Sequence, residues 1–157
     1  MRGDPDNEDA IVETIEISAP PERVFRALTD TRELTAWWGD ERMYACDRWE
    51  LDLRVGGRWR AIGHSVRGGS FQVEGEFLEI DPPRVLSYTW KPDWVEVPAT
   101  IIRIELEAIP AGTRLTWTQS GFSGYPRALA DQRSGLPSVL SWLRAFLELA
   151  ETVASRR

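Results

Sequence analysis

The 157-residue sequence contains a single cysteine, Cys46, and a single histidine, His64. One cysteine excludes an internal disulfide and a multi-cysteine zinc site, and it favours a reducing compartment. The sequence contains no Ser/His/Asp arrangement, no Walker loop and no cluster of histidine with acidic residues. We therefore expect neither a metal ion nor a cofactor. His64 is expected to face outward, and Cys46 is expected to be a buried, inert thiol.

Basic residues and long apolar runs are also scarce. Nineteen Lys and Arg residues against twenty-five Asp and Glu residues give a net charge of -6, which argues against nucleic acid as a partner. No apolar stretch approaches the roughly 20 residues that cross a bilayer, so membrane insertion is not expected. Residues 1–10 predict a disordered polar leader and residues 11–157 a single cytoplasmic domain.

Tryptophan, by contrast, is abundant, with eight in the chain. Tryptophan supplies large apolar contact area, whereas histidine supplies much of the acid/base chemistry of enzymes. The composition therefore favours binding over catalysis.

The periodicity of apolar residues predicts an α+β fold. Two short helices should follow a first strand. The first starts within residues 18–22 and carries Val24, Phe25 and Leu28 at helical spacing, and the second spans 31–38. A loop at 121–135 should precede a long helix at 136–153. Short turns between the remaining strands indicate an antiparallel meander of seven strands that curls around the last helix. The expected strands are 11–18, 49–55, 58–65, 70–80, 85–90, 100–108 and 113–119.

One face of these strands is strongly apolar and aromatic. Such a face forms either a solid core or the wall of a ligand cavity, and the spacing leaves both interpretations open. Acidic residues mostly occupy the opposite face, so Glu76 or Glu79 would point inward only if a β-bulge shifted the register. The inward positions are Trp49, Leu51, Leu53, Trp59, Ala61, Phe71, Val73, Leu86, Tyr88, Trp90, Ile102, Ile104, Leu106, Leu115 and Trp117.

Five motifs occur in order along the chain: ISAPPERVFRALTD at 17–30, LTAWWG at 34–39, DLRVGGRW at 52–59, GEFLEIDPPRVLSYTW at 75–90 and TRLTW at 113–117. Together they resemble the activator-of-heat-shock-ATPase-homologue branch of the START-like, or SRPBCC, superfamily. The resemblance spans residues 11–153. It implies a helix-grip fold like that of the birch pollen allergen, in which the sheet and the last helix enclose an apolar cavity.

The resemblance also implies positions for the site residues. Trp37 and Trp38 would lie at the mouth, Trp59, Phe71, Tyr88 and Trp117 on the wall, and Leu140, Leu143 and Phe146 on the last helix. Trp49 and Trp90 join this set from the strand pattern, and Gln119 or Tyr88 would orient the ligand. Trp94 and Trp142 are expected at the surface.

The leading hypothesis is binding of a small apolar molecule, aromatic or lipid-like, by a monomer or homodimer. An alternative is an enzyme of the cyclase or dehydrase type, in which Glu76 or Tyr88 moves a proton. A third hypothesis is an interaction module for a chaperone or regulator, anchored on Trp94 and Val95. Chaperone activation itself is less favoured, because the eukaryotic activators use an additional N-terminal domain that ten polar residues do not replace.

Overall fold

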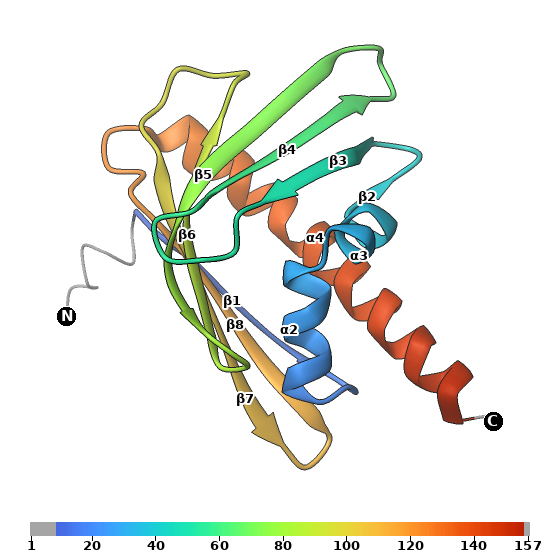
Figure 1. Cartoon of the computed structure of the whole chain (residues 1–157). Coiled ribbons are helices and arrows are strands. Elements are labelled where there is room, and N and C mark those ends of the chain that lie inside the picture. The colour runs from blue at the N-terminus through green and yellow to red at the C-terminus, as the bar shows by residue number, and fades with distance from the viewer. Residues whose placement is uncertain (1–8, 156–157) are drawn as a thin grey trace.

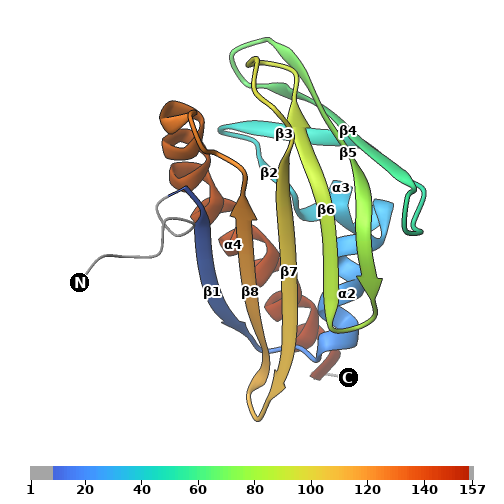
Figure 2. The ribbon, with the colours of Figure 1, turned by 90° about the vertical axis from the view of Figure 1, so that its left-hand side faces the viewer.

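An antiparallel sheet of eight strands curves around one long helix in the computed structural model, which describes residues 9–155 (Figure 1). The strand order across the sheet is β1-β8-β7-β6-β5-β4-β3-β2. Figure 2 shows α4 behind the sheet, with the two short helices beside it. Along the chain the elements are β1 (Ile11–Ile17), α2 (Pro21–Thr29), α3 (Thr31–Trp37), β2 (Gly39–Asp40), β3 (Tyr44–Leu51), β4 (Arg58–Ser65), β5 (Ser70–Asp81), β6 (Val85–Pro92), β7 (Thr100–Ile109), β8 (Gly112–Ser120) and α4 (Pro126–Ser155).

The element order confirms the expected α+β architecture, with eight strands in place of seven. The additional strand is the two-residue β2, which pairs with the start of β3. The expected strand at 49–55 is wrong at both ends, since β3 begins at Tyr44 and ends at Leu51. The chain leaves the sheet there because Arg54 and Gly57 close a turn, with Gly56 at φ +84°. Leu53, expected to point inward, is consequently 44% exposed.

The last helix begins ten residues earlier than expected. Gly135 and Pro137 disfavour a helix, and the sequence pattern therefore predicted a loop up to residue 135. The structure starts α4 at Pro126, a residue suited to the first helical position, and continues it through both. Among residues 9–155, no helix has the length and apolar character needed to cross a bilayer.

The expected polar leader at residues 1–10 lies mostly outside the described residues. Its last residue, Ala10, is buried, and its carbonyl accepts a hydrogen bond from the Arg133 guanidinium of α4 at 3.0 Å. Ala10, which precedes β1, is therefore packed against α4.

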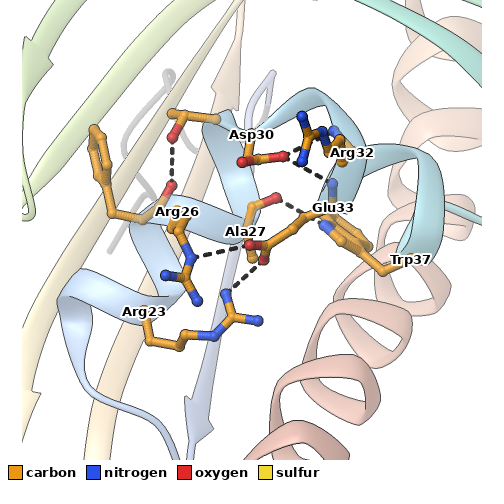
Figure 3. Close-up of polar contacts among 9 residues, drawn as sticks. Arg23, Arg26, Ala27, Asp30, Arg32, Glu33 and Trp37 are labelled. Atoms are coloured by element: carbon orange, nitrogen blue, oxygen red, sulfur yellow. Dashed lines mark hydrogen bonds and ion pairs between the residues drawn. The ribbon is translucent and has the colours of Figure 1, made fainter.

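Polar contacts fix the corner between α2 and α3 (Figure 3). The Asp30 carboxylate caps α3 by accepting from the backbone N–H of Glu33 at 3.2 Å. The Glu33 carboxylate pairs with Arg23 of α2 at 2.5 Å, and the Trp37 indole donates to the Ala27 carbonyl at 2.9 Å. These contacts turn Trp37 into the interior and hold the next residue, Trp38, over the concave face of the sheet.

A glycine in β5 permits a hydrogen bond that crosses the strand. The Trp59 indole of β4 donates to the Thr89 carbonyl of β6 at 3.0 Å, directly past Gly75. A Cβ at position 75 would lie 1.8 Å from the Thr89 oxygen and 2.5 Å from Trp59 Nε1. Any side chain there would displace backbone or break this bond.

We expect Gly75→Ala to lower the free energy of unfolding by about 1–3 kcal/mol, the range typical of overpacked interiors. Urea denaturation monitored by circular dichroism measures the change. Gly135→Ala is the matched control, because its Cβ would meet nothing within 4 Å in α4. That change should raise stability by about 0.5–1 kcal/mol. A Gly75→Ala protein as stable as the wild type would contradict the packing described here.

Candidate functional site

A cavity of about 470 Å³ lies between strands β3–β6, the two short helices and α4. This volume is within the roughly 300–1,000 Å³ of small-molecule sites. Of the described residues that line the cavity, none is Asp, Glu, Lys, Arg or His. The polar side chains on its wall are Tyr44, Tyr88, Ser65, Ser70 and Gln132, together with the thiol of Cys46.

The cavity has an exposed rim and a buried inner end. The rim includes Met43 and Trp94, which are 45% and 56% exposed. The inner end is formed by buried apolar side chains such as Leu34, Phe77 and Leu86. A ligand would therefore enter past the rim, where Ser65, Ser70 and Gln132 also lie, and place its apolar part inside.

Five aromatic rings form a continuous series at the rim. Trp142 of α4 contacts Tyr44, Tyr44 contacts Phe71, and Phe71 contacts Trp94, each edge-to-face with centroids 5.6 Å apart. Trp94 in turn contacts Trp90 at 5.8 Å. Edge-to-face packing is a favoured aromatic geometry, so the series links β3, β5, β6 and α4 around the opening.

Deeper indoles are held by hydrogen bonds through their N–H groups. Trp59 donates to the Thr89 carbonyl, Trp49 donates to the Cys46 carbonyl at 3.1 Å, and Trp38 donates to the Tyr44 hydroxyl at 3.3 Å. With each N–H occupied, the indole rings present apolar surface to the cavity. The wall is accordingly both oriented and apolar.

The titratable groups on the wall are uncharged at neutral pH. Burial raises the pKa of the Tyr44 hydroxyl to about 12 and that of the Cys46 thiol to about 12. Burial also raises the pKa of Tyr88 above its ordinary value. Because a phenol or thiol ionises by becoming an anion, an apolar environment favours its protonated form.

Half of the predicted binding residues line the cavity, and half lie elsewhere. Trp117 and Gln119 of β8 are 1% and 0% exposed and belong to the solid core beneath the other half of the sheet. Gln119 donates to the Thr100 hydroxyl at 2.9 Å. The structure brings together Trp38, Trp49, Trp59, Phe71, Tyr88 and Trp90 on the wall and leaves Trp37, Trp117, Gln119, Leu140, Leu143 and Phe146 outside it.

The division follows the two stripes of α4. Leu136, Val139 and Trp142 face the cavity, whereas Leu140 and Leu143, offset around the helix, are fully buried in the core. Phe146 lies one turn farther on, and the Arg23 guanidinium carbon lies over its ring, 5.6 Å from the ring centroid. Trp142 was expected at the surface, but it is partly buried and lines the rim. Trp94 is exposed, as expected, and lines the rim as well.

Glu76, the candidate carboxylate, is exposed on the outer face of β5. A β-bulge does occur in this strand, but it lies between Phe77 and Glu79 and therefore after Glu76. The bulge leaves both Leu78 and Glu79 exposed, and Glu79 pairs with Arg103. Neither carboxylate reaches the cavity.

A second bulge explains why the sequence pattern missed Tyr44 and Cys46. Pairing between β3 and β4 shifts between Cys46 and Arg48, so Asp47 is an extra residue. Residues 44 and 46 consequently share the inward face with Trp49 although their parity differs. The sequence feature that could have indicated this bulge is the acidic residue Asp47, which lies between the apolar residues Cys46 and Trp49.

A curved antiparallel sheet that closes on one long helix around an apolar cavity defines a helix-grip protein of the START-like class. The chain belongs to the Activator of Hsp90 ATPase homolog 1-like family, whose model matches residues 18–148. A search of curated proteins finds no significant relative.

Solved structures share this fold along nearly their whole length. Protein CV1439 from Chromobacterium violaceum is 28% identical with a TM-score of 0.77, covering 90% of this chain and 98% of its own. Protein NE0264 from Nitrosomonas europaea is 24% identical with a TM-score of 0.79, covering 94% and 99%. The AHSA1-like protein from Aeromonas hydrophila is 21% identical with a TM-score of 0.77, covering 90% and 94%.

The raised pKa of Cys46 predicts slow thiol chemistry. With a pKa of about 12 against an ordinary value of 9.0, its reaction with Ellman's reagent at pH 8 should be slower than that of a free thiol. A pKa about three units higher means that, at the same pH, the native protein holds about a thousandfold less thiolate than a free thiol does. The rate should rise about tenfold per pH unit and reach the ordinary value in guanidinium chloride. A native rate equal to the unfolded rate would contradict the burial of this thiol.

Proposed function

We propose that this protein binds a small, uncharged, apolar molecule in the cavity between strands β3–β6 and α4. The observation that carries the proposal is a space of about 470 Å³ with an aromatic rim and no charged side chain among its described lining residues. Such a wall favours an apolar ligand, because burial contributes roughly 25 cal/mol per Å² of apolar surface before ordering costs.

The proposal places binding ahead of catalysis on chemical grounds. Proton transfer near neutral pH needs a group that ionises near that pH, positioned against the substrate. Glu76 lies outside the cavity, and burial raises the pKa of both Tyr44 and Tyr88. No described lining residue is suited to act as a base at pH 7.

The arrangement of Trp94 bears on the interaction-module hypothesis. Its ring is exposed, yet it packs edge-to-face on both Phe71 and Trp90 and lines the cavity. This placement supports a role at the cavity opening more directly than a role as a protein anchor. We also propose a cytoplasmic location, where Cys46 would remain a free thiol.

We expect Ala61→Phe to weaken binding of the uncharged fluorescent probe N-phenyl-1-naphthylamine by about tenfold or more. Ala61 is 3% exposed and lines the cavity, so the added ring would occupy ligand space. Fluorescence titration measures the dissociation constant, and thermal unfolding checks that the variant folds. Ile62→Phe, on the next residue of β4 and outside the cavity lining, is the control and should bind as the wild type does. This site would be contradicted if both changes weakened probe binding equally, or if neither change weakened it.

We also expect the affinity for the same probe to be constant from pH 5 to pH 9. Tyr44 and Cys46, each with a pKa raised to about 12, stay protonated over this interval. Affinity should fall only at more alkaline pH, where ionisation would place an anion beside an apolar ligand. Titrations in buffers of matched ionic strength test this, and a midpoint between pH 5 and pH 9 would mean that another group controls binding.

A further inference from the structure

Tyr88 lies on the inward face of β6, between Phe77 of β5 and Ile102 of β7 in the sheet. Its side chain lines the cavity, although the residue is only 9% exposed. The ring is held from two sides, edge-to-face against Trp59 at 5.3 Å and against Phe77 at 6.2 Å. The phenol is therefore fixed in direction rather than free to turn to solvent.

The hydroxyl of Tyr88 has no hydrogen-bond partner among the described residues. The other polar groups nearby are satisfied: Ser87 donates to the Ile102 carbonyl at 3.0 Å, and the Trp59 indole donates to the Thr89 carbonyl. Among the described residues, the buried side-chain polar atoms without a partner are Trp117 Nε1 and Gln119 Oε1, neither of which lines the cavity. The Tyr88 hydroxyl is not one of them, so it is accessible from the cavity. A ligand that covers this hydroxyl without accepting from it would leave a buried donor unpaired, which costs free energy, whereas a ligand with an acceptor avoids that cost.

The O–H donor of this residue is satisfied by an acceptor, and its surroundings favour an uncharged one. The apolar surroundings keep Tyr88 protonated, so it presents an O–H to the cavity. A carboxylate or phosphate on the ligand would be buried without a cation, since no Lys or Arg is among the described lining residues. A carbonyl oxygen meets both requirements.

The wall around Tyr88 favours an aromatic ligand over a flexible aliphatic one. Trp49 and Trp59 lie with ring planes 20° apart and centroids 6.4 Å apart, and Trp38 packs on Trp49 at 5.3 Å. Contact between an indole ring and an aromatic ligand stabilises the complex by more than the buried area alone accounts for. A planar ligand also loses less conformational freedom on binding than a flexible aliphatic ligand does.

We propose that the ligand is a neutral aromatic carbonyl compound whose oxygen accepts a hydrogen bond from the Tyr88 hydroxyl at the inner part of the cavity. This inference rests on the proposed function and narrows it to one chemical class. Tyr88 is then a specificity-determining residue, because it separates ligands that have an acceptor from shape-matched ligands that lack one.

Three probes of nearly equal shape test the proposal. They are 2-acetylnaphthalene, 2-isopropenylnaphthalene, in which CH₂ replaces the carbonyl oxygen, and the 2-naphthoate anion. Isothermal titration calorimetry on the full chain gives the dissociation constants. The wild type should bind the ketone about three- to tenfold more tightly than the alkene, the range of one net hydrogen bond, and the anion more weakly than both.

Tyr88→Phe should abolish the preference for the ketone while leaving alkene affinity unchanged, which also shows that the cavity is intact. Tyr125→Phe, at a 38% exposed tyrosine outside the cavity lining, is the matched control and should retain the preference. If ketone and alkene bind equally, or if Tyr88→Phe keeps the preference, the inference is overturned and apolar binding in the cavity stands. If naphthoate binds most tightly, the inference is overturned and so is the preference of the cavity for an uncharged ligand. If none of the three probes binds, both the inference and the proposed function fail.

Discussion

The structure depends on one geometric constraint, which is that one long helix and two short helices must cover the concave face of an eight-stranded sheet. Eight strands would span about 35–40 Å if flat, whereas a helix with its side chains is about 10–12 Å across. The sheet therefore curls, and α4 packs over β1 at one side. Core leucines of α4 such as Leu143 are fully buried, whereas beneath strands β3–β6 a cavity remains.

The two halves of the molecule consequently use similar residues for different purposes. In the solid half, Trp117 fills space and is 1% exposed. In the hollow half, Trp49 and Trp59 are anchored through their N–H groups to backbone carbonyls and leave their rings on the cavity wall. The anchoring explains how a wall of large side chains can keep a space open instead of collapsing into it, since each ring is tied to the sheet.

Charge is separated from this interior. On the outer face Arg114 pairs with both Glu16 and Glu107, and Arg103 pairs with Glu79. Exposed pairs of this kind contribute little to stability individually. Their position nevertheless keeps full charges in water, so that the described cavity wall presents aromatic, aliphatic and neutral polar groups. Family membership agrees with this architecture, while the choice of ligand depends on the particular side chains of the wall.

Local periodicity was sufficient to predict most of the strands, both short helices and the order in which they occur. Each of these elements needs an apolar stripe of its own period, and that requirement is visible in the sequence. Pairing was harder to predict, because the bulge at Asp47 depends on hydrogen bonds to β4 and changes which residues of β3 face inward. Tyr44 was missed for this reason. Cys46 is buried, as expected, but its place on the cavity wall was missed for the same reason.

The site was predictable as a set of aromatic residues but not as a cavity. The same apolar pattern satisfies a filled core and a hollow one, because both exclude water from the same face. Trp38 and Trp117 illustrate this, since their rings lie 6.2 Å apart but only Trp38 reaches the cavity. The sequence by itself determined the elements and the face they bury. The tertiary structure alone decided where the buried volume is filled and where a cavity remains, because that depends on how far α4 and the two short helices can cover a curved sheet.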